Sequence, residues 1–203
     1  MTVHGSLLVT STVAGSKLFA LPLGLTASAT VISYMLTFVV LDTVAELYGA
    51  ALPRLVINLG LFGMALSALY FKLAIALPPA PTWHHQHAFE TVFTASWRIW
   101  FAGWFSYLIS QHFDVWGFLK LREVTHGRAP LTIRALAGML IGQLFDTVVF
   151  LTFAFYGEFA LLPAIIGQYL IKIMVASFGA PLVPIFVALG RHYLRGEADQ
   201  LLP

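Results

Sequence analysis

The chain has 203 residues, of which 59% are hydrophobic and only 10% are charged, with a formal net charge of +2. A soluble domain carries about 25% charged residues, so this composition excludes a soluble domain of this size and indicates a chain surrounded mostly by lipid. The sequence contains no cysteine, which excludes disulfides and thiol chemistry. A single transmembrane domain over residues 1–203 is expected, because no polar stretch is long enough to form a second domain.

Six segments of the chain are long and apolar enough to cross a bilayer, which takes roughly 20 mainly apolar residues. In chain order they are Ser6–Leu23, Ser28–Tyr48, Leu55–Leu77, Ser96–Leu119, Leu131–Tyr156 and Leu161–Leu189. Gly179, Pro181 and Pro184 lie within the last segment and predict a kink there. The sequence therefore predicts an all-α integral membrane protein, a bundle of six transmembrane helices.

The lysines and arginines between these segments predict the orientation in the membrane. Seven of them lie on one side of the expected bundle, namely Arg54, Lys120, Arg122, Arg128, Arg134, Arg191 and Arg195. The connections on the other side have none. Because basic residues are retained preferentially in the cytoplasm, both the N- and C-termini are expected to be cytoplasmic. The basic residues thus serve as topology signals, and no nucleic-acid partner is expected.

Eight ionisable residues lie within or at the edges of the predicted spans: Lys17, Asp42, Glu46, Lys72, Arg98, Asp114, Asp146 and Lys172. Each costs at least about 2.5–3.5 kcal/mol at the centre of an isolated helix, so each is expected to have a partner or to face water. Lys72 and Arg98 lie near helix ends, from which they can reach the surface. Lys17 and Lys172 fall near the middle of their spans and are expected to balance buried acids. Two interpretations stay open, a pathway for a polar solute and ion pairs that only hold the bundle together.

The pattern I-x-Q-x-F-D-x-x-x-F-L occurs at Ile109–Leu119 and again at Ile141–Leu151. The two copies lie on helices expected to be antiparallel, and each places an amide, a carboxylate and an aromatic ring on one helix face. These residues are Gln111, Asp114 and Phe118 in the first copy and Gln143, Asp146 and Phe150 in the second, while Asp42 and Glu46 share a further face. Carboxylates and amides can pair with the N–H edge of a planar base, and a ring can stack on it. A guanine-like edge fits best, although a sugar site could use the same residue types.

His84, His85 and His87 lie in the expected outer loop. Three histidines can bind a metal ion, but the sequence shows no evident fourth ligand. A solvated polar loop is therefore expected there, and the sequence predicts neither a metal site nor a cofactor.

The run Leu36–Gly49 contains T-F-x-x-x-D-x-x-x-E-x-Y-G, in which Asp42 and Glu46 are the two acids. This run resembles the signature of the queuosine-precursor transporter family, also called putative vitamin uptake transporters, and the order of later features agrees over nearly the whole chain. Those features are Arg98, Gln111, Asp114, Phe118, Gln143, Asp146, Phe150, Phe155–Gly157, Lys172 and Pro181. One departure is visible, since such proteins often have proline two residues before the T-F pair and this chain has Met35.

The resemblance implies a multi-pass carrier in a bacterial inner membrane that is not an enzyme. The implied substrates are 7-cyano-7-deazaguanine and 7-aminomethyl-7-deazaguanine, the precursors of the tRNA nucleoside queuosine. The implied substrate-binding residues are Asp42, Glu46, Arg98, Gln111, Asp114, Phe118, Gln143, Asp146, Phe150 and Lys172, with Lys17 as a charge-balancing residue. A secondary carrier in the lipid bilayer is expected, either as a single chain or as a homo-oligomer.

Two other interpretations stay open. The first is the substrate-binding subunit of an energy-coupling-factor vitamin transporter, which is also a small six-helix protein. Against it, the first segment has no clear A-x-x-x-A stripe, since Ala14 is followed four residues later by Leu18. The second is an intramembrane aspartyl protease that uses Asp114 and Asp146, because two carboxylates can share a proton. Against it, no G-x-G-D surrounds either residue, and the repeated glutamine and phenylalanine have no role in that chemistry.

Overall fold

The computed structural model describes residues 2–14, 17–20, 26–93, 97–158 and 160–201. Within these ranges the chain forms eight α-helices and two short β-strands. In chain order the elements are α1 (Thr2–Ala14), β1 (Leu18–Ala20), β2 (Thr26–Ser28), α2 (Thr30–Tyr48), α3 (Ala51–Ala76), α4 (Gln86–Phe93), α5 (Trp97–Val124), α6 (Leu131–Phe155), α7 (Leu161–Gly179) and α8 (Leu182–Leu201). The strands form an antiparallel pair in which Leu18 is opposite Ser28. The described chain is therefore all-α, as expected, apart from this small hairpin.

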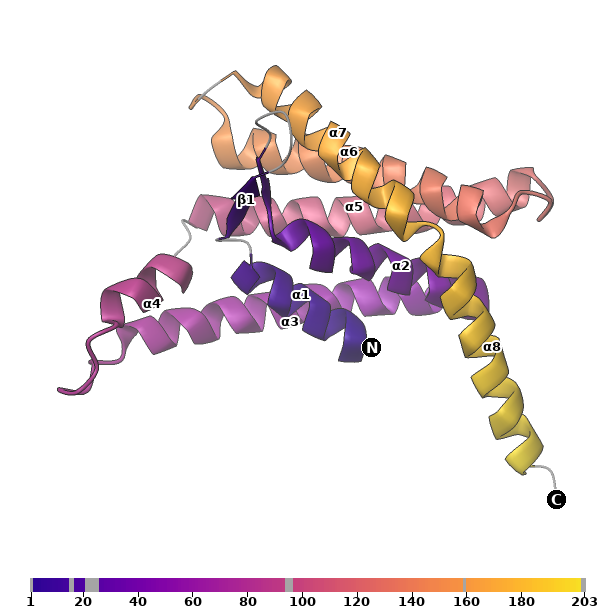
Figure 1. Cartoon of the computed structure of the whole chain (residues 1–203), viewed down its shortest axis with the longest axis horizontal. Coiled ribbons are helices and arrows are strands. Elements are labelled where there is room, and N and C mark those ends of the chain that lie inside the picture. The colour runs from indigo at the N-terminus through magenta and orange to yellow at the C-terminus, as the bar shows by residue number, and fades with distance from the viewer. Residues whose placement is uncertain (1, 15–16, 21–25, 94–96, 159, 202–203) are drawn as a thin grey trace.

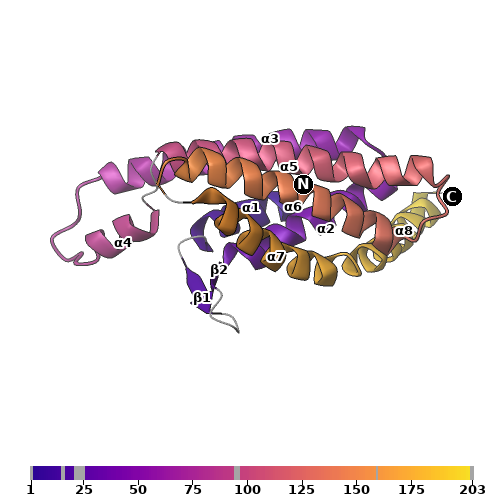
Figure 2. The same ribbon diagram turned by 90° about the horizontal axis from the view of Figure 1, so that it is seen from above.

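The long helices lie side by side in one elongated bundle (Figures 1 and 2). Helices α5 and α6 run along most of its length, with α2 and α3 on one side of α5 and α7 packed against α6. The turns that follow α2 and α5 lie at one end of the bundle, and α8 extends away from that end. The hairpin, α4 and the connection from α6 to α7 lie at the opposite end. The predicted basic side of the bundle is therefore one physical end of it, and the cytoplasmic location of that end stays a prediction.

Four stretches of the described chain are long and apolar enough to cross a membrane: α2, α3, α6 and Leu161–Arg195, which runs through α7 and α8. Helix α5 is long enough, with 28 residues, but it is less apolar and carries ionisable side chains along its length. Helix α1 has 13 residues and reaches about 20 Å, which is less than the roughly 30 Å of a hydrocarbon core. The predicted count of six spans is therefore not confirmed.

The first predicted span differs from the structure. A continuous helix is predicted through Ser6–Leu23, but α1 ends at Ala14 and β1 begins at Leu18. An apolar run by itself does not separate helix from strand, and here the backbone turns back, so that the Ala29 N–H donates to the Lys17 carbonyl at 2.8 Å. Residues 15–16 and 21–23 of the predicted span lie outside the described residues.

The last predicted span divides into two helices at the predicted kink. Helix α7 ends at Gly179 and α8 begins at Leu182, so Pro181 stands between them. Proline has no amide hydrogen to donate and its ring clashes with the preceding turn, which explains the break at this position. Helix α4 is an element that the sequence did not predict, and it lies on α3 through Phe93, whose ring centroid is 4.5 Å from that of Phe71.

The outer surface of α3 is apolar over several turns. Phe62, Leu66, Leu69 and Leu73 are all more than half exposed, and their spacing places them on one helix face. Soluble proteins rarely leave a continuous apolar stripe of this kind in water, so this face suits lipid tails. The interior, in contrast, contains buried polar and charged side chains from α2, α5, α6 and α7.

Helices α5 and α6 approach each other closely because glycines line the α6 side. A Cβ atom added at Gly138 would lie 2.8 Å from the Asp114 carbonyl oxygen, and one at Gly142 would lie 2.8 Å from the Ser110 carbonyl oxygen. The spacing of Gly138 and Gly142 is that of a G-x-x-x-G motif, which lets membrane helices pack backbone to backbone. Because of this close contact, Asp114 lies directly against the backbone of α6.

Candidate functional site

Residues from three helices form one line through the bundle, most of them polar and most of them buried, here called the polar seam. Its members recur every fourth residue, so on each helix they share a face. They are Tyr34, Phe38, Asp42 and Glu46 on α2, Ser110, Asp114, Phe118 and Arg122 on α5, and Arg134, Gly138, Gly142 and Asp146 on α6. Twelve residues separate the ends of each line, which corresponds to about 18 Å along a helix. The seam therefore covers more than half the thickness of a hydrocarbon core.

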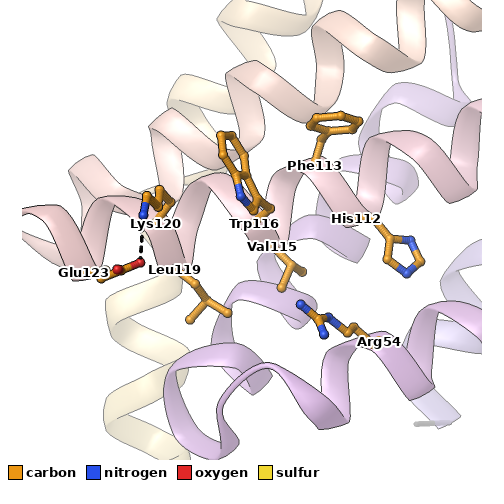
Figure 3. Close-up of a pocket in the computed structure, with 8 residues that line it drawn as sticks. All are labelled: Arg54, His112, Phe113, Val115, Trp116, Leu119, Lys120 and Glu123. Atoms are coloured by element: carbon orange, nitrogen blue, oxygen red, sulfur yellow. Dashed lines mark hydrogen bonds and ion pairs between the residues drawn. The ribbon is translucent and has the colours of Figure 1, made fainter.

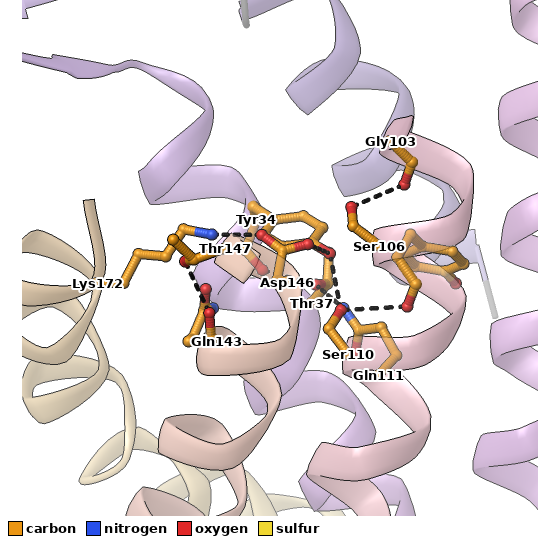
Figure 4. Close-up of polar contacts among 11 residues, drawn as sticks. Tyr34, Thr37, Gly103, Ser106, Ser110, Gln111, Gln143, Asp146, Thr147 and Lys172 are labelled. Atoms are coloured by element: carbon orange, nitrogen blue, oxygen red, sulfur yellow. Dashed lines mark hydrogen bonds and ion pairs between the residues drawn. The ribbon is translucent and has the colours of Figure 1, made fainter. Parts of the chain in front are cut away.

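At one end of the seam Asp146 is the centre of a hydrogen-bonded group (Figure 4). The Tyr34 hydroxyl donates to Asp146 Oδ1 at 3.1 Å, and the Ser110 hydroxyl lies 3.3 Å from the same tyrosine oxygen. From α7, Lys172 Nζ donates to Asp146 Oδ2 as an ion pair. Asp146 and Lys172 are each 7% exposed, so this is a buried ion pair. The structure thus gives Lys172 the acidic partner that the sequence predicted.

Two glutamines lie beside this group. Gln111 Nε2 donates to the Thr37 hydroxyl at 2.9 Å, and Thr37 in turn donates to the Tyr34 carbonyl at 2.6 Å. The side-chain carbonyl oxygens of Gln111 and Gln143 are buried and have no hydrogen-bond partner within the described ranges. A buried acceptor without a donor costs free energy. These two oxygens are thus unsatisfied acceptors close to the Asp146 group in the described structure.

The opposite end of the seam is an ion-pair cluster around Glu46. Arg134 Nη2 lies 2.5 Å from Glu46 Oε2, Arg122 Nη1 lies 3.5 Å from the same oxygen, and Arg191 Nη2 lies 3.6 Å from Oε1. These arginines come from α5, α6 and α8, and the glutamate side chain is only 9% exposed. Glu46 is a predicted substrate-binding residue on α2, and in the structure its carboxylate contacts arginines from three other helices.

Between these two ends lie Asp42 and Asp114, which are both 0% exposed. None of their four carboxyl oxygens has a hydrogen-bond partner in the part of the chain that the structure describes. Phe118 is also fully buried, and the Arg134 guanidinium lies 4.4 Å from the centroid of its ring. No hydrogen bond joins Asp114 to Asp146 within the described residues.

Three further predicted residues lie outside the seam. Arg98 donates to the carbonyl oxygens of Phe153 and Tyr156 at 2.8 and 2.7 Å, and so caps the end of α6. Phe150 is half-buried, and its ring packs edge-on against Phe155. Lys17 is exposed beside the hairpin, which corrects the expectation that it lies in mid-membrane, because the predicted helix around it does not form.

Two cavities open near the seam, and the smaller one reaches it at Glu46. The larger, of about 510 Å³, lies between α3 and α5 and has Arg54, His112, Trp116 and Lys120 among its lining residues (Figure 3). It holds none of the predicted site residues. The smaller, of about 350 Å³, is lined by Glu46, Leu47, Arg191, Leu194 and Arg195, and so reaches the ion-pair cluster from one end of the bundle.

Sequence reasoning missed Tyr34, Thr37 and Ser110 and treated Arg134 only as a topology signal. A signal for Tyr34 was present, because the predicted Asp42–Glu46 face extends by steps of four residues through Phe38 to Tyr34. Ser110 follows in the same way from Asp114. No comparable signal identifies Thr37, since its role depends on the position of Gln111 across the helix interface.

Comparisons with known proteins identify the family of this chain. The family described as "Putative vitamin uptake transporter" matches residues 28–186, which include the whole seam. A protein of Bacillus subtilis (strain 168) named "Probable queuosine precursor transporter" is 30% identical over 161 residues, covering 78% of this chain and 70% of that protein. No solved structure matches the chain. The chain therefore belongs to the family of putative vitamin uptake transporters, which are multi-pass membrane proteins.

Proposed function

We propose that this protein is a secondary carrier that imports the 7-deazaguanine precursors of queuosine across a bacterial inner membrane. The proposal is supported by the name of the Bacillus relative and by the chemistry of the Asp146 group. The observation that carries it is the buried pair of Asp146 and Lys172, with the Tyr34 hydroxyl and two amide oxygens beside it.

The edge of a deazaguanine base presents a carbonyl acceptor next to two N–H donors. Asp146 offers two acceptor oxygens, and Lys172 offers donors from the opposite side. Asp146 and Lys172 pair with each other in the structure, so a base that binds either side chain takes the place of a buried partner. The side-chain carbonyl oxygens of Gln111 and Gln143, which have no partner within the described ranges, would add acceptors for the remaining N–H groups.

The sharpest test combines binding by the purified protein with uptake by cells. Asp146→Asn retains the volume of the side chain but removes its charge and one acceptor. A hydrogen bond to a charged group contributes about 1.5–3 kcal/mol, so affinity for 7-cyano-7-deazaguanine should fall by roughly one to two orders of magnitude. The matched control is Glu123→Gln, which changes an exposed acid that pairs with Lys120 near the end of α5, and this variant should bind like the parent.

Binding is measured by ligand-induced thermal stabilisation in detergent, with guanine, a hexose and an amino acid as competitors. Uptake is measured as queuosine in tRNA of a bacterium that can neither make nor import the precursors. If the parent protein is not stabilised by either deazaguanine and does not restore queuosine, the assignment of the substrate is wrong.

The orientation is tested separately by single cysteines, because the chain has no native cysteine. Thr82 and Gly127 are both exposed, in the turns at opposite ends of the bundle. Thr82→Cys should react with an impermeant thiol reagent on intact cells, whereas Gly127→Cys should react only after lysis. The reverse pattern would invert the proposed topology.

A further inference from the structure

Asp42 and Asp114 are the least satisfied groups in the described structure. Both are fully buried, and none of their four oxygens accepts a hydrogen bond within the described ranges. An ionised carboxylate without partners is among the costliest groups to bury, and such groups normally neutralise instead. Their position between the Asp146 group and the Glu46 cluster places them on the axis of the proposed pathway.

The space around Asp114 is too small for a nucleobase. If Gly138 were alanine, its Cβ would lie 3.0 Å from Asp114 Oδ1. If Gly142 were alanine, its Cβ would lie 2.9 Å from Asp114 Cβ. The Cβ of an alanine at position 142 would also lie 3.0 Å from the ring of Phe38. Phe38 and Phe118 are both 0% exposed. Asp114 itself is 0% exposed and lies against the glycine backbone of α6, so this close-packed site suits a proton better than a planar base.

A metal ion is a poor alternative occupant. A hard cation needs several oxygen ligands at once, and no group of three or more His, Cys, Asp or Glu residues in the described chain could hold a metal. Carboxyl groups that share a buried site instead hold protons readily, because two adjacent charges repel each other.

The charged groups around the pair are few. Asp114, Arg134 and Glu46 act electrostatically on Asp42. Other ionisable groups on these helices have partners of their own within the described residues. Asp146 pairs with Lys172 and Tyr34, Arg122 and Arg191 pair with Glu46, and Lys120 pairs with Glu123. His4 contacts Tyr107, His112 Nδ1 lies 2.7 Å from the Leu108 carbonyl oxygen, and Arg54 lines the cavity between α3 and α5. Arg134 also has a buried Nε that has no acceptor among the described residues, so a carboxylate that loses its proton has a cation to replace it.

We propose that Asp42 and Asp114 form a proton-binding pair that couples import of the substrate to inward movement of a proton. The inference rests on the proposed function and deepens it, since it assigns the driving ion to a site separate from the Asp146 group. One proton enters with each substrate molecule, binds the carboxyl pair while the substrate occupies the Asp146 end, and leaves toward the Glu46 end. No covalent bond to the substrate changes.

The test uses the full chain in proteoliposomes with the membrane potential clamped at zero and labelled 7-cyano-7-deazaguanine as the probe. An inward gradient of about one pH unit should drive roughly tenfold accumulation by the parent, since a tenfold ratio corresponds to about 1.4 kcal/mol. Asp42→Asn and Asp114→Asn should lose this accumulation, yet retain ligand-induced stabilisation and exchange of labelled for unlabelled base. Glu123→Gln should behave like the parent in all three assays.

An independent readout needs no substrate. Infrared spectra of the purified parent near neutral pH should contain the C=O stretch of a protonated carboxyl group, and each Asn variant should lose part of it. Accumulation by both variants at the parent level, or the absence of the protonated band from the parent, overturns the inference. Folded Asn variants that no longer bind the base overturn it as well, because the pair would then contact substrate. If instead the parent fails to bind or exchange the base while the protonated band is present, the proposed function fails and the proton site stands.

Discussion

Asp114 and Asp146 occupy equivalent positions in two copies of one sequence pattern, yet they differ in their hydrogen-bond partners. Asp146 accepts hydrogen bonds from Tyr34 and Lys172, which come from α2 and α7. Asp114 faces the glycine surface of α6 and accepts none within the described residues. The equivalence itself is real, because Phe113 and Phe145, the residues before each aspartate, stack with ring centroids 3.9 Å apart. Neighbouring helices, and not the local motif, therefore decide which carboxylate is paired.

The largest expected effect on stability comes from removing Lys172, the cation that pairs with Asp146. Lys172→Met strands a buried carboxylate and should lower the free energy of unfolding by about 3–5 kcal/mol. Denaturant unfolding in mixed micelles measures this. The control is Lys17→Met, which removes an exposed lysine and should change stability by no more than about 0.5 kcal/mol. Equal losses from the two substitutions would contradict the structure on both lysines.

Combining Lys172→Met with Asp146→Asn sharpens the same comparison. The double variant has no unpaired buried charge at this site, so it should recover about half or more of the stability lost by Lys172→Met alone. A double-mutant cycle on the same unfolding assay gives the coupling. Strictly additive losses would mean that the two side chains do not interact in the folded protein.

Stability around Asp114 should depend on the close packing of α5 and α6, because Asp114 has no hydrogen-bond partner to lose among the described residues. Gly142→Ala places a methyl group against the Ser110 carbonyl and the Asp114 side chain, and overpacking of this kind costs about 1–3 kcal/mol. Gly63→Ala on α3 is the matched control, because a Cβ there meets nothing within 4 Å and helix propensity favours alanine by up to about 1 kcal/mol. A neutral Gly142→Ala would show that α5 and α6 are not in close contact.

The smallest effect is expected at the edge of the Asp146 group. Tyr34→Phe removes one hydroxyl that donates to Asp146 and contacts Ser110, and a hydrogen bond of this kind contributes about 0.5–1.5 kcal/mol. Affinity for 7-cyano-7-deazaguanine should fall by less than it does in Asp146→Asn. A loss as large as that of the aspartate variant would place Tyr34 at the centre of the site.

The sequence predicted α2, α3 and α6 to within a few residues at most boundaries, because an apolar run of spanning length needs no information about its neighbours. It was wrong about the first segment, where the chain turns back as a hairpin after Ala14. The structure places the predicted site residues in different surroundings. Seven of them are buried, namely Asp42, Gln111, Asp114, Phe118, Gln143, Asp146 and Lys172. Arg98 instead caps a helix end, and Glu46 binds three arginines. Which of the buried residues contact substrate stays a prediction.

Composition and hydropathy by themselves determined that this chain is a helical membrane protein with ionisable residues in its apolar segments, because each helix must satisfy its own backbone in lipid and its apolar surface can be read from the sequence. Only the tertiary structure decided how those charges are used. Asp42 and Glu46 are one helical turn apart, yet Glu46 has three arginine partners while Asp42 has none in the described chain. Pairing depends on side chains supplied by α5, α6, α7 and α8, and the distances between helices are set by packing that no single segment encodes.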